Sequence, residues 1–184
     1  MAAAAGNVIE PTNTIGGAGQ TLRNAGAPVN GTNEVQTLTI GGAPTAGAGS
    51  GVSFSYQGLV SALALWSATN ATFVANVQAA LDGLFGAAAT VVAVGTATAG
   101  VGTFTITFSG AVLAARNLGA ALGVTNAMTG ASPTAAVART TPGVDATHRG
   151  ASAGQLLVDT INDLAYQNGG VPGAPVWGKV GTQT

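Results

Sequence analysis

Apolar and polar residues alternate strictly in two segments near the middle of the chain. Residues 103–108 (TFTITF) alternate threonine with phenylalanine or isoleucine, and residues 52–57 (VSFSYQ) alternate large apolar residues with serine or glutamine. Successive side chains of a strand point to opposite faces of a sheet, so each segment is predicted to be a strand with one buried face. Threonine is favoured in strands, which suits the exposed face of the first segment.

Weaker patterns extend the predicted sheet. Residues 35–40 (VQTLTI) place Leu38 and Ile40 on one face, with Val35 either on the threonine face or displaced by a bulge. Residues 59–66 are predicted to continue the sheet as the next strand of a hairpin. Residues 41–51 are predicted to be a turn-rich link, and residues 90–94 a short strand. Residues 111–122 are predicted to be a loop containing one helical turn, and residues 135–140 the closing strand.

One segment has a helical period instead. Apolar residues recur at spacings of four, four and three, which makes one stripe on an amphipathic helix of about residues 71–85. Asn70 or Thr72 is predicted to cap its N-terminus, and Gly86 to end it in a left-handed conformation. We expect this helix to pack on one face of the sheet. The stripe consists of Phe73, Val77, Leu81 and Leu84.

The two ends of the chain have weaker patterns. Residues 1–33 are rich in Gly, Asn and Thr and sustain neither period. They are either a disordered tail or an extended arm that orders on a neighbouring subunit, with Ile9, Ile15 and Leu22 inserted into surface pockets. Residues 143–184 begin after a Pro-Gly boundary and contain three short predicted strands: 155–158, 164–167 and 176–180.

The C-terminal segment is too small to fold unaided. Three short strands bury little surface, so we expect this module to need the central domain or another subunit as a partner. Its large aromatics, Tyr166 and Trp177, are expected either to anchor an intersubunit contact or to pack on the central domain.

These patterns together predict an α+β fold that is mainly β. A small antiparallel β-sheet domain with one packed amphipathic helix covers residues 34–142. It is flanked by the extended N-terminal arm, 1–33, and by a small C-terminal β-hairpin module, 143–184.

Composition narrows the classes of function. Charged residues are 6 % of the 184 residues, against about 25 % in ordinary soluble domains. The five bases are scattered, so no basic stripe neutralises phosphates and we expect no nucleic-acid partner. No stretch approaches about 20 apolar residues, which predicts no membrane span, and the N-terminus does not resemble a signal peptide. Aromatics are only 5 %, so the core is expected to be small and contacts with neighbouring copies to add stability.

The residues that carry chemistry are few. The chain has no Cys, and His148 is its only His, with no second imidazole or thiolate to complete a metal site. Asp159 and Asp163 lie about a predicted turn, either as solvated acids or as a weak cation site. The glycine-rich run 41–51 lacks the Lys-Ser/Thr ending of a phosphate loop. We therefore predict no enzyme activity, no catalytic residue, no cofactor and no metal.

Several motifs, taken in order, resemble a β-rich domain of tailed-bacteriophage structural proteins. They are residues 33–42 (NEVQTLTIGG), 77–81 (VQAAL), 104–110 (FTITFSG) and 140–143 (TTPG). The C-terminal segment is similar to the tails of phage fibre and head-decoration proteins, through residues 147–151 (THRGA), 154–160 (GQLLVDT) and 177–182 (WGKVGT). The chain departs from the family at 111–117 (AVLAARN), where the family often has a Gly-containing stretch.

The resemblance implies a structural role in the virion. The leading expectation is a capsid decoration protein, made in the host cytoplasm, that binds the major capsid protein on the outer surface of the head as a homotrimer. A tail or fibre component is the alternative within that class. From another class, an exposed Ser/Thr sheet face suits a glycan- or host-surface-binding module, although the sequence groups no aromatics with acids or amides.

Overall fold

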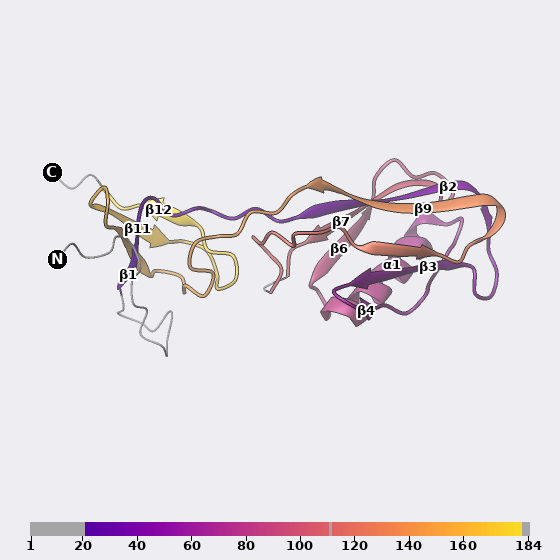
Figure 1. Cartoon of the computed structure of the whole chain (residues 1–184), viewed down its shortest axis with the longest axis horizontal. Coiled ribbons are helices and arrows are strands. Elements are labelled where there is room, and N and C mark those ends of the chain that lie inside the picture. The colour runs from indigo at the N-terminus through magenta and orange to yellow at the C-terminus, as the bar shows by residue number, and fades with distance from the viewer. Residues whose placement is uncertain (1–20, 111, 182–184) are drawn as a thin grey trace. The chain divides into compact units, whose positions relative to one another are not determined.

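The computed structural model describes residues 21–110 and 112–181 and confirms a mainly β fold with one helix among the described residues (Figure 1). The chain divides into two compact units. The central unit is Asn33–Leu113 with Asn117–Pro142. The terminal unit has as its described residues 21–32, 114–116 and 143–181.

The larger sheet of the central unit has four antiparallel strands. Their order is β6 (Thr90–Val94), β7 (Gly102–Phe108), β2 (Val35–Thr45) and β9 (Thr129–Thr141). The alternation predicted for 103–108 is confirmed, because all its phenylalanine and isoleucine side chains are fully buried. Val35 lies on the threonine face of β2, and the β2–β9 register also shifts between Val35 and Gln36, so both readings of this position describe part of the structure.

Strand β2 runs further than predicted, into the expected link 41–51. A second register shift against β9 falls between Gly41 and Ala43. Gly42 has a φ of +75°, and a Cβ there would lie 2.1 Å from the carbonyl oxygen of Ser132. Only glycine fits this bulge without displacing the partner strand.

The second sheet is built around β3 (Gly51–Tyr56). Its other strands are β4 (Leu59–Val60), β5 (Ala64–Leu65) and β8 (Gly123–Asn126). The segment predicted as one return strand is divided into β4 and β5, which pair with opposite ends of β3. The interruption coincides with Ser61, whose hydroxyl accepts a hydrogen bond from the Phe54 N–H at 2.9 Å. Strand β8 was not predicted.

Helix α1 (Asn70–Phe85) confirms the predicted amphipathic helix. Of its apolar stripe, Phe73, Val77 and Leu81 are buried and Leu84 is partly buried. The predicted N-terminal caps are wrong, whereas Gly86 does end the helix. Thr69 precedes the helix and makes no side-chain cap, while the Asn70 carboxamide donates to the Ala97 carbonyl and accepts from the Gly100 N–H, each at 2.7 Å. Asn70 therefore holds the β6–β7 loop instead of the helix end. Gly86 has a positive φ, 95°, but its ψ of 153° is not left-handed helical.

Aromatic side chains join α1 to the two sheets. Phe73 meets Phe104 edge to face with ring centroids 5.0 Å apart, and Phe85 meets Phe108 in the same way at 5.6 Å. Tyr56 also lies beside Phe85, with ring centroids 5.5 Å apart. Each fully buried phenylalanine is worth about 1.5–3 kcal/mol, so these rings supply much of the stability of a core with few large residues.

The segment predicted as a loop with one helical turn contains no helix in its described part, 112–122. It forms a hydrogen-bonded turn at 112–115, and then an irregular stretch that returns to the central unit. We call residues 117–122 the return loop. Side chains of the sheet hold this loop in place, as described below.

The terminal unit is a four-stranded sheet to which both ends of the chain contribute. Its order is β1 (Thr21–Asn24), β10 (Leu156–Asp159), β11 (Leu164–Asn168) and β12 (Trp177–Lys179). Strand β1, which was not predicted, pairs in parallel with β10 and places Leu22 beside Leu157. Of the predicted arm, residues 1–20 lie outside the described residues. The three C-terminal strands thus gain a fourth strand and an apolar side chain from the N-terminal segment.

Candidate functional site

A buried carboxylate lies just before strand β2. Glu34 is fully buried and forms a two-point ion pair with Arg139 of β9, with Oε1 to Nε at 3.1 Å and Oε2 to Nη2 at 2.9 Å. Gln36, also fully buried, donates its carboxamide N–H to Glu34 Oε1 at 2.6 Å. Glu34, just before β2, and Gln36, within it, therefore place two polar side chains on the inward face ahead of the apolar Leu38.

The pKa of Glu34 is lowered in spite of its burial. Burial alone opposes ionisation, but hydrogen bonds from Gln36, from the Leu118 N–H and from Arg139, together with the charge of Arg139, favour the carboxylate more strongly. Glu34 is thus a stable buried anion with a structural set of partners. A general acid or base needs a pKa near the working pH, which this environment does not provide.

These polar groups fix the return loop to the sheet. The Leu118 N–H donates to Glu34 Oε2 at 3.0 Å, and the Leu122 N–H donates to Gln36 Oε1 at 2.8 Å. Arg139 Nη1 donates to the Gly119 carbonyl at 3.2 Å. The loop has no regular secondary structure, so side chains satisfy the backbone groups that a ladder or helix would otherwise pair.

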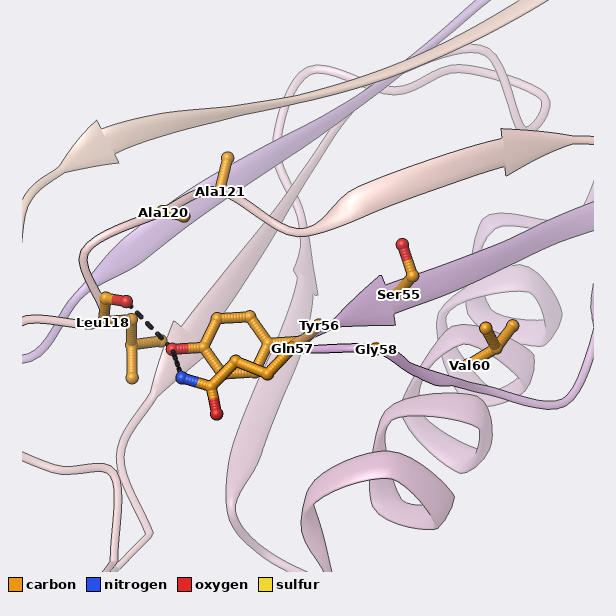
Figure 2. Close-up of a pocket in the computed structure, with 8 residues that line it drawn as sticks. All are labelled: Ser55, Tyr56, Gln57, Gly58, Val60, Leu118, Ala120 and Ala121. Carbon is orange, nitrogen blue, oxygen red and sulfur yellow. Dashed lines mark hydrogen bonds between the residues drawn. The ribbon is translucent and has the colours of Figure 1, made fainter.

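The fixed loop forms one wall of an open depression of about 410 Å³ (Figure 2). The turn between β3 and β4 forms the other wall, and the Tyr56 hydroxyl bridges the two by donating to the Leu118 carbonyl at 2.9 Å. The lining residues are Ser55, Tyr56, Gln57, Gly58, Val60, Leu118, Ala120 and Ala121.

The turn beside the depression has an unusual backbone. Gln57 and Gly58 both have positive φ, 49° and 84°, as in the tight hairpin turns that normally favour Asn-Gly. The Gln57 carboxamide lies beside the Tyr56 hydroxyl, at 3.4 Å, and its side chain is exposed. An aromatic ring, an amide and the Ser55 hydroxyl therefore line one depression. The signal in the sequence was the Gln-Gly pair after an alternating strand.

The structure places three of the five predicted assembly residues in the terminal unit. Leu22 and Trp177 are buried together with Ala151 and Leu157, and Tyr166 packs against this cluster partly buried. The Trp177 indole N–H donates to the Thr147 carbonyl at 2.9 Å. These side chains fill a core of their own unit, because β1 adds Leu22 to it. Ile9 and Ile15 lie outside the described residues, and the role of all five in assembly stays a prediction.

Other apolar side chains are exposed to solvent. In the central unit Leu59 and Val60 of β4 are 62 % and 68 % exposed, and Leu63 and Leu65 next to them are also exposed. We call these four residues the β4–β5 patch. Exposed apolar residues of the terminal unit include Ile161, Val171 and Val176. Composition predicted few large residues, but not that several would lie on the surface.

Asp159 and Asp163 lie in different environments in the terminal unit. Asp159 is buried, and its carboxylate accepts hydrogen bonds from the N–H groups of Gly26, Ile161 and Asn162 and from the Asn162 carboxamide. Burial opposes its ionisation, yet these donors lower its pKa. Asp159 is therefore not a solvated turn acid, while Asp163 lies exposed in the turn with a φ of 51°.

His148 occupies a turn of the terminal unit with a φ of 50°, and its carbonyl accepts the Ala151 N–H at 2.8 Å. Within residues 21–110 and 112–181, no group of three or more His, Asp or Glu side chains is placed to hold a metal ion. Among the described residues, no helix has the length and apolar character needed to cross a bilayer.

Comparisons of the chain with protein-family models, with curated proteins and with solved structures found no match.

Proposed function

We propose that this chain is a structural protein of a tailed-phage virion, a capsid decoration protein that binds the outer surface of the head. The resemblance of residues 33–143 and 147–182 to phage structural proteins motivates the proposal. The structural observation that carries it is the β4–β5 patch, which gathers exposed Leu and Val side chains on one short segment. A concentration of exposed apolar residues in one segment marks that segment as a candidate contact.

The mechanism is stabilisation by mass action. A ligand that binds only the assembled shell stabilises it by an amount that grows with the logarithm of its concentration above Kd. Burying the exposed part of each leucine or valine of the β4–β5 patch contributes less than the value of about 1.5–3 kcal/mol for a fully exposed side chain. The partners are the major capsid protein and further copies of the chain, as a homotrimer at threefold positions.

The test is to purify the virions of the encoding phage, identify the chain by mass spectrometry, and locate its density by cryo-electron microscopy. Density over capsomer junctions is the expected result. Density in the tail would favour the alternative, a tail or fibre component. Absence of the chain from purified virions would refute both.

A matched pair of variants tests whether the β4–β5 patch makes the contact. Val60→Ser, which alters an exposed side chain of the patch, is expected to weaken binding to heads that lack the protein. Val91→Ser alters an equally apolar, exposed position on β6, and is expected to bind as the unmodified chain does. Equal binding by both variants would exclude the patch as the contact.

A second candidate function rests on the depression of Figure 2. An aromatic ring, an amide and a hydroxyl are groups that a sugar contacts, and here Tyr56, Gln57 and Ser55 provide them. The sequence alone did not indicate that these groups line one depression. Binding of the purified chain to a glycan array, lost in Gln57→Ala, would support a glycan-binding module. No binding on the array would argue against it.

A further inference from the structure

The two edges of the larger sheet differ. Strand β6 is the edge next to α1, and the Gln78 side chain of the helix closes it. The Gln78 carboxamide accepts from the Val92 N–H at 2.9 Å and donates to the Thr90 carbonyl at 3.0 Å. These two bonds reproduce what a neighbouring strand would make, so another chain cannot pair at this part of the edge.

Strand β9 is the opposite edge, and its outer backbone groups follow from the hydrogen-bond alternation. The Phe108 N–H donates to the Glu34 carbonyl, so the even-numbered residues of β2 face β7 and the odd-numbered ones face β9. In the β2–β9 register, Thr37 is opposite Ala138 and Thr39 is opposite Ala136. The intervening residues Ala135, Val137 and Arg139 therefore direct their N–H and C=O groups away from β2. In the described residues, β2 is the strand that pairs with β9.

The open part of this edge has a defined end. Pro133 has no N–H, and its carbonyl already accepts a hydrogen bond from Asn126 at 2.8 Å. The edge lacks the free charges that commonly protect edge strands, because the Arg139 guanidinium is held by Glu34. Three residues with free outer groups are left, spaced symmetrically about Val137.

We propose that this edge pairs with the β9 edge of a second copy of the chain, antiparallel about a twofold axis at Val137. In this register Val137 faces its own equivalent, and Ala135 faces Arg139 of the second copy. All three outer N–H groups and all three outer C=O groups of each copy are used, which gives six interchain hydrogen bonds. A register displaced toward the turn would place Arg139 opposite Pro133, which cannot donate.

The outer-face side chains permit this contact. On the outer face Thr134 would lie opposite Thr140 of the second copy, and Ala136 opposite Ala138, so no like charges meet. The result is one eight-stranded sheet whose two outer edges are both β6, each closed by Gln78. Pairing therefore stops at two copies, as an isologous contact does. The inference does not depend on the proposed function: by itself, the edge contact joins two copies of the chain into a dimer.

Disulfide crosslinking tests the register, because the chain has no Cys of its own. In Val137→Cys the two Cα atoms would lie about 5.5 Å apart, within disulfide range. In the matched control Ala135→Cys, on the same strand and face, the two cysteines would be offset by four residues, about 13 Å, which is beyond that range. We expect mild oxidation to crosslink the first variant and not the second. No crosslink in Val137→Cys, or equal crosslinking in both, would overturn the proposal.

Mass measurement tests the hydrogen bonds independently. Ala135→Pro removes an outer N–H without breaking the β2–β9 ladder, and proline is tolerated at such edge positions. Ala135→Ser keeps the N–H. By light scattering on a sizing column, Ala135→Pro is expected to have half the mass of the unmodified chain and of Ala135→Ser. Equal masses for all three would contradict the edge pairing.

Discussion

Removing Arg139 tests whether the buried Glu34 carboxylate depends on its partner. Arg139→Met keeps most of the apolar stem but leaves a fully buried carboxylate with only Gln36 and the Leu118 N–H as donors. Breaking a fully buried ion pair costs about 3–5 kcal/mol. The Arg139 side chain is 24 % exposed, so solvent screens part of the interaction. We expect a loss of about 2–3 kcal/mol in the free energy of unfolding of the central unit at pH 7.

The assay is urea unfolding followed by tryptophan fluorescence. Trp66 is buried in the central unit and Trp177 in the terminal unit, so a Trp177→Phe background makes the signal report on the central unit. The decisive control is Glu34→Gln combined with Arg139→Met, which removes the stranded charge. If charge is the cause, the double variant is more stable than Arg139→Met alone. Equal stability of the two would refute the reasoning.

The pH dependence provides a second check on the same pair. The pKa of Glu34 is lowered in the folded chain, so its stabilising contribution is fully present above its unfolded pKa and is lost as pH falls through the folded value. In Arg139→Met the carboxylate loses its positive partner, which raises its folded pKa. The difference in the free energy of unfolding between the unmodified chain and Arg139→Met is therefore expected to become smaller as pH falls from 7 toward 4. A gap that stays constant over this range would contradict the role of the charge.

The remaining predictions concern other positions. Asp159 has a lowered pKa, so the terminal unit is expected to lose stability as pH falls through the folded pKa of Asp159. Asp159→Asn is expected to make the stability of this unit less dependent on pH, as measured by urea unfolding followed by the fluorescence of the terminal-unit tryptophan. An unchanged pH profile would show that the carboxylate is not responsible. Gly42→Ala is expected to destabilise the central unit by more than about 1 kcal/mol, because of its positive φ and the carbonyl oxygen against its missing Cβ. Gly47→Ala, where nothing lies near, is expected to stay within about 0.5 kcal/mol, and equal effects would argue against the bulge. Leu22→Ala is expected to lower the free energy of unfolding of the terminal unit by about 2–5 kcal/mol, whereas Val29→Ala, at an exposed position, is expected to change it little. A small effect of both variants would mean that β1 is not part of the terminal core.

The sequence predicted the elements whose signal is local. Residues 103–108 and the stripe of α1 were predicted correctly because a strand or a helix that buries one face has apolar residues at a regular spacing. This spacing can be recognised within a short stretch of sequence. Strand β1 was missed because its partner, β10, lies more than a hundred residues away, and four residues with one buried leucine carry no period. The N-terminal cap of α1 was wrong because Asn70 binds the 97–100 loop, a tertiary contact that no local rule anticipates.

The candidate site was only partly visible in the sequence. Gln36 lies on the same face of β2 as Leu38 and Ile40, so the alternation of the sequence indicates a buried polar residue at this position. Its partners were not, because Arg139 and the return loop reach it through tertiary structure. The depression was missed for the same reason: Tyr56 and Leu118 are 62 residues apart and meet across a single hydrogen bond.

Charge is scarcer on the surface than the composition implies. Of eleven charged side chains, Glu34 and Asp159 are buried, and Arg139 is bound to the first of them. The outer face of the larger sheet carries Thr37, Thr105 and their Ala and Val neighbours, with no charge between them. Charges of one sign keep proteins apart in solution, and this chain has few to do so. Scarce surface charge is therefore consistent with the two contacts proposed above, one through the apolar side chains of the β4–β5 patch and one through the backbone hydrogen bonds of the β9 edge. Salt is expected to screen both contacts little.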